Sequence, residues 1–503
     1  MIDISKLNPV QLEQFIHLQA TIARQDDEAA QVRLLRDYYD GEQGVLLTKR
    51  QREFIGDMLK PDMPSFSHNL VKSVIDTLRE RLSVTGLDAP DGDDGDATST
   101  QAITTALWQW FERGRMNAEQ IRLYRRTLRD GKSYIMVDFD SVNNRPRFTL
   151  HHVDAGDQQP GVMFHRDPED ENHVLFACRY WYQGVNPLKP NEAGWKRKTV
   201  YLPDQIRKYV LGKGGTWEPV QDDGDASWPL PWVDNTGAPL GIPLVEFANP
   251  GGSEVTQVIG LQNALNKAWL DLIAASDFNG FPILAIEYNT ANLGPSANTQ
   301  SDADSEDADE IRMSPGRLLE VDDATIHRIE AANPVPLIEV INRIEQAISG
   351  VSRTPAYYLR PVGGSDVPSG EALKQLESGL VRRAEERQLV FGQAWQDVFG
   401  LAYRVNQTFG TRLPDVPELS IDVTWQDANV RNELTEAQTA EAYQRLGVPQ
   451  PELWSMLGFT PEQIEQFQNA QIADKQAQVA AVAAAMRVNA SRTGQPAQNG
   501  QAA

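Results

Sequence analysis

Three histidines in one segment are the residues best suited to binding a metal ion or taking part in catalysis. His151 and His152 are adjacent, Asp154 follows them, and His165 lies further along. Imidazole and carboxylate groups are common protein ligands of zinc, so this grouping raises the question of a metal site. Adjacent residues of a regular strand point to opposite faces, so His151 and His152 cannot both bind one ion from such a strand. We therefore expect structural or surface histidines and no bound metal.

Other patterns that could support chemistry are incomplete. Residues 130–133 read DGKS but lack the upstream glycine of a phosphate-binding loop, and the chain has no G-x-S-x-G sequence. The acidic stretch 88–100 (DAPDGDDGDATST) could hold calcium, but without the ligand order of an EF-hand it is more simply a solvated loop. The single cysteine, Cys178, lies in the apolar run VLFACRYWY and is expected to be buried. We expect neither catalysis nor a cofactor.

The composition argues against general binding to nucleic acid. The 503 residues carry a formal net charge of −23, whereas affinity for DNA comes mainly from Lys and Arg on phosphates. An acidic protein-binding subunit and an acidic conduit that lets DNA slide both fit this charge. Asp3 and Lys6 interrupt any N-terminal apolar run, and Asp271 and Asp277 interrupt the longest internal ones. We therefore expect no signal peptide, no membrane span and synthesis inside the cell.

Residues 334–406 carry the most information about the elements. Apolar residues recur every three or four positions over 337–351, which predicts a helix that ends at Thr354-Pro355. A loop rich in glycine and proline follows, and Ser369 is a candidate N-cap for a second, much longer helix. The long helix is expected to have an apolar face and a charged face. The apolar face comprises Leu373, Leu376, Leu380, Ala384, Phe391, Trp395, Phe399 and Ala402, and the charged face comprises Lys374, Glu377, Arg382, Arg383, Glu385, Glu386 and Arg387.

Elsewhere the pattern predicts helices first and strands after them, an α+β arrangement. Helices are expected at 9–39, 48–59, 70–82 and 100–129, and a short strand at 83–87. Strands are expected at 134–137, 148–150, 174–182, 197–202, 205–211, 282–288, 317–321 and 419–425, with helices again from 432. GKGG at 212–215 is expected to be a hairpin turn.

A further helix, capped by Ser253 and running through Phe278, has a broad apolar face. If the helix at 337–351 is its antiparallel partner, both can also face equivalent helices of neighbouring copies. This is the physical reason to expect an oligomer. The residues assigned to this interface are Leu261, Leu265, Trp269, Leu272, Leu337, Ile341, Ile344 and Ile348.

Sequence motifs within residues 334–406 point to a particular protein family. ISGVSRTPAYYL, a flexible loop, SGEALK and a long helix with a charged middle resemble the portal proteins of tailed double-stranded DNA bacteriophages, in the siphovirus-like portal family. DYYDGEQG near the start and NLVKSVID are also similar to that family. The resemblance covers about residues 38–458 and is strongest at 315–403.

The resemblance implies a multidomain α+β ring subunit. Its parts would be an α+β wing (1–252), two antiparallel stem helices (253–280 and 335–354) around a small α/β clip (281–334), a tunnel loop (355–370), a long spine helix (371–409), a wing strand (410–430), an all-α crown (431–486) and a disordered tail (487–503). The resemblance also implies a dodecameric ring at one capsid vertex of the virion, assembled in the host cytoplasm. Genomic double-stranded DNA would be packaged and ejected through it, without catalysis.

The implied partners are the terminase large subunit, a head-tail adaptor, capsid and scaffolding proteins, and the DNA in the tunnel. The tunnel-loop residues are Tyr357, Tyr358, Arg360, Gly363, Gly364, Ser365, Asp366, Ser369 and Gly370. Arg360 could touch phosphates, or it could pair with Glu371 or Asp366 as an ordinary surface arginine. Two other functions stay open at this point: a nucleic-acid enzyme such as a nuclease or motor subunit, and another acidic virion protein such as a head-tail adaptor.

Overall fold

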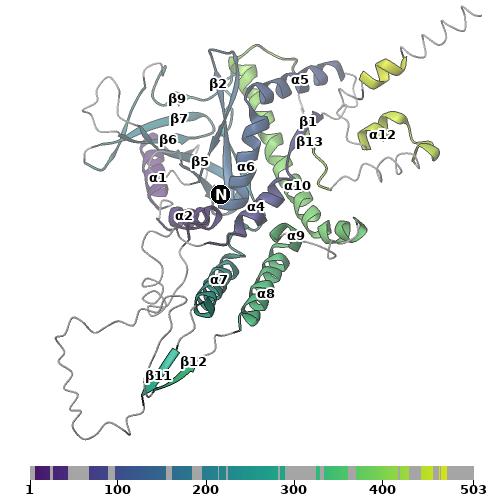
Figure 1. Ribbon diagram of the computed structural model, residues 1–503. Helices are drawn as coiled ribbons and strands as arrows, with labels where there is room; N and C mark the ends of the chain where they lie inside the picture. Colours follow the sequence, from purple (N-terminus) through teal and green to yellow (C-terminus); the bar gives the residue numbers. More distant parts are fainter. Residues whose placement is uncertain are drawn as a thin grey trace, which may run out of the picture. The chain divides into compact units, whose positions relative to one another are not determined.

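The chain folds into two compact units in a computed structural model. The structure describes residues 6–22, 26–43, 67–88, 97–153, 161–183, 195–212, 214–222, 225–280, 284–288, 324–328, 333–360, 370–416, 420–429, 443–456, 464 and 466–472. The first unit comprises 1–41, 69–259 and 349–503, and the second comprises 42–68 and 260–348. Each unit is described by itself below (Figure 1).

The first unit mixes helices and antiparallel sheets, which confirms the predicted α+β class. Its helices are α1 (Pro9–Ile22), α2 (Asp26–Asp40), α4 (Val71–Arg79), α5 (Ala97–Arg113), α6 (Met116–Asp130), α9 (Ala356–Leu359), α10 (Gly370–Phe409) and α12 (Gln450–Met456). Its strands are β1 (Val84–Asp88), β2 (Lys132–Asp140), β3 (Arg145–His151), β4 (Gly161–Asp167), β5 (Asp170–Gln183), β6 (Trp195–Tyr201), β7 (Gln205–Leu211), β8 (Trp217–Pro219), β9 (Leu230–Pro231), β10 (Leu244–Ala248) and β13 (Asp422–Trp425).

These strands form three sheets. A three-stranded sheet has the order β10-β2-β3, and a larger sheet runs β4-β5-β6-β7-β8 with β9 paired to β7. The turn between β2 and β3 forms where Asn143-Asn144 predicts it, because the Asp140 carboxylate accepts the N–H groups of Val142 and Asn143 at 3.1 and 3.2 Å. The predicted turn at 212–215 likewise joins β7 to β8, with the Gly212 N–H donating to Thr216 O at 2.8 Å.

The third sheet pairs segments far apart in the sequence. β13 lies antiparallel to β1, with Val84 opposite Trp425 and Asp88 opposite Asp422. The strand predicted at 419–425 therefore returns to the N-terminal half of the chain, but it joins a separate two-stranded sheet. Cys178 is fully buried on β5, as expected, and burial raises the pKa of its thiol to about 12.

Two predicted helices differ from the structure. The helix expected at 100–129 is broken into α5 and α6 at Gly114-Arg115, where Arg115 has the left-handed φ of 59°. A Cβ on Gly114 would lie 2.9 Å from Trp110 O, in the last turn of α5, so another side chain there would require the backbone to shift. The expected 9–39 helix appears as α1 and α2, with 23–25 outside the described residues. The helix expected at 48–59 also lies outside them.

The helix predicted to start after Ser253 was placed too early. α7 (Ile259–Gly280) starts six residues later, and turns occupy 254–258. The reason is that the expected first turn is bonded to the end of α6. Ser253 Oγ donates to Arg129 O and accepts from the Val255 N–H at 3.1 Å, while the Glu254 N–H donates to Leu128 O at 3.0 Å.

The long helix α10 organises the first unit. Trp395 at its middle is fully buried, donates from Nε1 to the Tyr124 hydroxyl at 2.8 Å, and contacts the rings of Phe111, Phe247 and Phe399. Its predicted apolar face is largely confirmed by burial of Leu380, Ala384, Phe391, Trp395, Phe399 and Ala402.

Two parts of the α10 prediction are wrong. Leu376 is 54% exposed, and three residues assigned to the charged, solvated face, Glu377, Arg383 and Arg387, are buried. These three residues find ionic partners on other elements, as described below. The side chain of Leu373 lies outside the described residues.

The second unit holds α7, the strands β11 (Leu284–Tyr288) and β12 (Ala324–Arg328), and most of α8 (Val335–Ser352). β11 and β12 are antiparallel, with Ile286 opposite Ile326. In Figure 1, α7 leads into β11 and α8 returns from β12. The strand expected at 282–288 is β11, whereas the strand expected at 317–321 lies outside the described residues, and β12 was not predicted.

His68 connects the two helices of this unit. Its N–H donates to Asn266 Oδ1 at 3.1 Å, its ring contacts that of Trp269, and its Nε2 lies 3.7 Å from Glu345 Oε1. Of the predicted interface residues, Leu265, Ile341 and Ile348 are buried, and Leu261, Trp269, Leu272, Leu337 and Ile344 are half-buried. None of the helices in the described part of the chain is long and apolar enough to cross a membrane.

Candidate functional site

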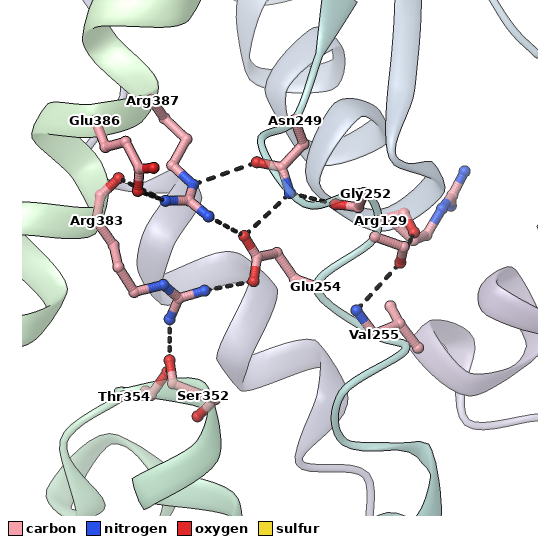
Figure 2. Close-up of polar contacts among 11 residues, drawn as sticks. Arg129, Asn249, Gly252, Glu254, Val255, Ser352, Thr354, Arg383, Glu386 and Arg387 are labelled. Carbon is pink, nitrogen blue, oxygen red and sulfur yellow. Dashed lines mark hydrogen bonds and ion pairs between the residues drawn. The ribbon is translucent and has the colours of Figure 1, made fainter.

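The candidate site is the polar junction that holds the N-terminal half of α10 against the rest of the first unit. Its centre is Glu254, whose side chain is only 3% exposed. Glu254 Oε2 accepts from Arg383 Nη2 at 2.5 Å, and Oε1 accepts from Arg387 Nη2 at 2.8 Å (Figure 2). Because buried charges are costly unless paired, the carboxylate and both guanidiniums depend on one another.

The side chain of Asn249 helps to fix Glu254 in place. Asn249, which follows β10, donates from Nδ2 to Glu254 Oε1 at 3.0 Å and to Gly252 O, and its Oδ1 accepts from Arg387 Nε at 3.2 Å (Figure 2). The Asn249 N–H donates to Gly131 O at 2.8 Å. The turn after β10 is therefore tied both to the end of α6 and to α10.

Arg383 extends this junction to the end of α8. Its Nη1 donates to Ser352 O, in the turn that closes α8 before Thr354-Pro355 (Figure 2). Arg353 in that turn has φ 49°, and Ser349 Oγ donates to Thr354 O at 2.7 Å. Burial lowers the pKa of Arg383 and the charge of Glu254 opposes that shift. Arg383 thus ties the end of α8 to α10 and to Glu254.

A second cluster lies around Glu377, one to two turns nearer the start of α10. Its Oε1 accepts from the hydroxyls of Tyr357 and Tyr358, the latter at 2.9 Å, and lies 3.4 Å from Arg81 Nη2. Arg81 also donates from Nη2 to the Tyr358 hydroxyl at 2.8 Å and from Nη1 to Ala428 O at 2.8 Å. This cluster joins α9 to α10, to the end of α4 and to the segment after β13.

Both tyrosines remain protonated at neutral pH and act as donors. Burial and the hydrogen bond to Glu377 raise the pKa of Tyr357, and burial likewise raises the pKa of Tyr358. The two rings also contact each other, with centroids 4.5 Å apart. The arrangement provides two phenol donors and one guanidinium to one carboxylate, which is a structural anchor and contains no nucleophile–base pair.

The two clusters bracket residues 361–369. α9 ends at Leu359 just before this segment, and α10 begins at Gly370 just after it. Of the predicted tunnel-loop residues, Tyr357 and Tyr358 therefore lie in the Glu377 cluster, Arg360 is exposed, and Gly370 is the first residue of α10. Gly363, Gly364, Ser365, Asp366 and Ser369 lie outside the described residues, as does the side chain of Glu371.

Sequence reasoning missed the buried ionic residues. Arg383 and Arg387 were assigned to the charged face of the helix, opposite its apolar face. Their spacing was informative, because Leu380, Arg383, Arg387 and Phe391 recur every three or four residues and share one stripe of the helix. Nothing local, however, pointed to Glu254 as their partner, since it lies 129 residues earlier than Arg383.

The histidines occupy buried positions away from this junction. Burial lowers the pKa of both His151 and His152 to about 3 and that of His165 to about 4. The ring of His165 stacks on Phe176. Within the described residues, no group of three or more His, Cys, Asp or Glu side chains is arranged to hold a metal ion. Asp154 lies outside those residues.

Comparison with known proteins identifies the family. A sequence model described as "Phage portal protein, SPP1 Gp6-like" matches residues 18–479. The chain belongs to this family of phage portal proteins. Portal proteins of Mycobacterium phages D29 and L5 are similar: the first is 22% identical over 82% of this chain and 79% of its own length, and the second is 23% identical over 80% and 76%.

Two solved structures are also similar to this chain. One is a chain from the virion of a native gene transfer agent particle, with 12% identity, a TM-score of 0.38, and coverage of 78% of this chain and 89% of the other. The other is an HK97 family phage portal protein from Corynebacterium diphtheriae, with 13% identity, a TM-score of 0.29 and coverage of 71% and 91%.

Family membership makes this chain a virion structural protein with a role in DNA packaging, which confirms the resemblance noted in the sequence.

Proposed function

We propose that copies of this chain form a ring, a dodecamer in the virion, at one capsid vertex through which genomic double-stranded DNA is packaged and ejected. Family membership over residues 18–479 supports this proposal. The ring has no catalytic activity of its own, and a separate ATPase supplies the energy for packaging. Assembly takes place in the host cytoplasm, before DNA is present in the capsid.

The parts of the chain have distinct places in this proposal. The α+β part of the first unit, with β13, forms the wing, and α10 is its spine. α7 and α8 form the stem, and residues 281–334 form the clip. Residues 431–486 form the crown. Leu261, Leu265, Trp269, Leu272, Leu337, Ile341, Ile344 and Ile348 pack the stem helices, and the half-buried members of this set can face neighbouring copies.

The proposed partners fall into two groups. The terminase large subunit and the head-tail adaptor dock on the clip, in turn, as packaging gives way to tail attachment. Capsid and scaffolding proteins surround the ring during assembly. The net charge of −23 suits a conduit, because an acidic wall repels the DNA phosphates and lets the duplex slide.

Residues 355–370 form the tunnel loop in this proposal. The observation that supports it is that Tyr357 and Tyr358 hold the start of the segment to Glu377 of α10, while Arg383 holds the end of α8 just before it. In this proposal the segment contacts the DNA while its start stays attached to α10. Arg360 is exposed at the start of the segment, where it can touch phosphates.

Negative-stain microscopy with rotational averaging tests the ring. A ring with an axial opening wide enough for duplex DNA supports the proposal, whereas protein that stays monomeric in the presence of capsid partners would refute it. ATPase and nuclease assays on the purified protein test the enzyme alternative, and activity in either would count against a purely structural role.

The loop assignment has its own test in an Arg360→Gln variant assayed for DNA packaging in vitro. The matched control is Arg343→Gln, which removes the same charge from a side chain that is 75% exposed and paired with Glu339. We expect slower packaging or weaker DNA retention with Arg360→Gln and no change with the control. Equal behaviour of the two variants would remove Arg360 from the DNA-contacting set.

A further inference from the structure

A groove of about 770 Å³ in the first unit lies along the edge of the three-stranded sheet. One wall is β10, at Leu244, Val245 and Glu246, and a second wall is α10 between Gln396 and Arg404. Residues of β4 and β5 form a third wall. Grooves that bind ligands in proteins typically measure about 300–1,000 Å³, so this one is large enough to hold a short stretch of chain.

The backbone of β10 is open toward this groove. In the part of the chain that the structure describes, β10 pairs with β2 and has no strand on its other side. The Val137 N–H of β2 donates to Pro243 O at 2.9 Å. Because the direction of hydrogen bonding alternates along an antiparallel strand, Leu244 and Glu246 direct their N–H and C=O groups away from β2. An open edge of this kind is a template for an added strand.

The wall opposite β10 belongs to the edge strand of the larger sheet. β4 stands first in the order of that sheet, and its Phe164 ring contacts the Tyr134 ring with centroids 5.0 Å apart. Arg166 of β4 forms an ion pair with Glu246 of β10, and both residues line the groove. This ion pair keeps the two edge strands on either side of the groove.

Two charged side chains of α10 line the groove without a direct partner. Asp397 and Arg404 are exposed, and neither side chain forms a hydrogen bond or ion pair with a residue in the described ranges. Partial burial raises the pKa of Asp397 and lowers that of Arg404, and the charge of each residue opposes the shift of the other. Gly400 between them leaves open space, since a Cβ there would meet no atom within 4 Å.

These features together select an extended peptide as the ligand. A peptide strand can exchange N–H···O bonds with the open edge of β10, which duplex DNA cannot do. Asp397 and Arg404 lie about 10 Å apart along the axis of α10. Side chains on one face of a strand repeat every ~7 Å, so a basic and an acidic side chain two or four residues apart can reach both charges.

A second copy of this chain is a poor donor of such a strand. Segment 411–416 is extended and carries both an arginine and an aspartate, but its backbone already bonds to side chains of α10. The Leu413 N–H donates to Gln407 Oε1 at 3.1 Å, and Gln407 Nε2 donates to Leu413 O at 2.9 Å. The Tyr403 hydroxyl donates to Pro414 O at 2.7 Å. These backbone groups cannot also pair with a strand edge.

We propose that this groove binds an extended segment of a different protein, which adds to β10 as a strand. The segment carries a basic side chain for Asp397 and an acidic side chain for Arg404, so its charges complement those of the groove. The site is independent of the tunnel loop and of the proposed ring.

Selection of a library of short random peptides on the purified full chain tests the groove. We expect enrichment of peptides that combine a basic and an acidic residue with β-branched residues between them. The most enriched peptide, labelled with fluorescein, then gives affinities by fluorescence polarisation. A library that yields no binder, or a binder whose affinity does not respond to changes in the groove, would overturn the proposal.

Arg404→Glu reverses the charge that faces the acidic residue of the peptide. We expect the enriched peptide to bind about tenfold or more weakly, because a like charge replaces an opposite one. A peptide whose acidic residue is changed to lysine should prefer the variant over the wild type. Arg382→Glu is the matched control, since Arg382 is an exposed arginine of the same helix outside the groove. Equal weakening by the two variants would refute the contact with Arg404.

Two substitutions at Glu246 test whether the peptide adds as a strand. Both remove the side chain that pairs with Arg166, but only Glu246→Pro also removes the N–H directed into the groove. Proline is tolerated on an edge strand where its missing N–H faces outward. We expect Glu246→Pro to bind the peptide about tenfold or more weakly than Glu246→Ala, and equal affinities would exclude strand addition.

Hydrogen exchange of the wild type covers the case in which Glu246→Pro does not fold. Adding the peptide should slow amide exchange within β10, measured by mass spectrometry on the full chain. Exchange in β10 that is the same with and without bound peptide would overturn the proposal.

A photo-crosslinking side chain at Gly400 identifies what fills the groove. With Gly400→p-benzoylphenylalanine, we expect a crosslink to the enriched peptide and none in the purified chain alone. Failure to crosslink the peptide would place it elsewhere and count against the proposal. Crosslinks within one chain or between copies would show that the chain itself fills the groove, and they would overturn the assignment to a different protein. These outcomes do not depend on the ring, which microscopy tests separately.

Discussion

Replacing Glu254 by glutamine is the most direct test of the junction in the N-terminal half of α10. The substitution keeps the shape of the side chain and removes its charge. Arg383 and Arg387, whose side chains are both 7% exposed, would then face a neutral amide with only one acceptor oxygen. Two guanidiniums would remain buried without a counter-charge, apart from the exposed Glu386 beside Arg387.

The size of the effect follows from burial. Removing one partner of a buried ion pair typically costs about 3–5 kcal/mol, since the remaining charge is left uncompensated. Glu254 serves two arginines and also accepts from Asn249, so we expect a loss of unfolding free energy at the upper end of that range. Glu386→Gln is the control: its side chain is 58% exposed, and such surface pairs contribute up to about 1 kcal/mol.

Urea unfolding followed by tryptophan fluorescence, at one fixed protein concentration, measures both variants. Combining Glu254→Gln with Arg383→Gln should cost less than the sum of the single changes, by about 1–3 kcal/mol, because the second change removes a charge that the first left unpaired. Additive effects, or a loss below about 1 kcal/mol for Glu254→Gln alone, would refute the view that this ionic contact holds the junction.

Two other predictions concern the Glu377 cluster and the buried histidines. Tyr358→Phe removes a hydroxyl that donates to Glu377 and accepts from Arg81, which should cost about 0.5–1.5 kcal/mol and speed proteolysis within 361–369. An unchanged cleavage rate would show that the cluster does not control access to this segment. The pKa of His165, about 4 in the folded state, lies below its unfolded value of about 6.5, so the unfolded chain takes up the proton first. Stability from this residue is therefore complete above pH 6.5 and falls by about 1.4 kcal/mol per unit as pH drops toward 4. Urea unfolding between pH 7 and 4.5 should show a shallower fall for His165→Asn than for the wild type, and parallel curves would contradict this.

Local sequence determined the elements with the strongest periodicity. α10, the β2–β3 hairpin and the strands β5, β6 and β7 follow from spacing that repeats every three or four residues or every second one, and from turn residues such as Asn143-Asn144. The sequence motifs within residues 334–406 also indicated the family. These features are local, so no knowledge of distant partners was needed.

Only the tertiary structure decided which charged residues of α10 are buried and where the helix after Ser253 begins. Three charged residues of α10, Glu377, Arg383 and Arg387, are buried because they pair with Arg81, Glu254 and two tyrosines. These partners lie on elements that are remote in the sequence. The start of α7 moves to Ile259 because the residues before it bond to the end of α6. In each case a long-range polar contact overrides the local preference, since the free energy of pairing a buried group exceeds that of one helical turn.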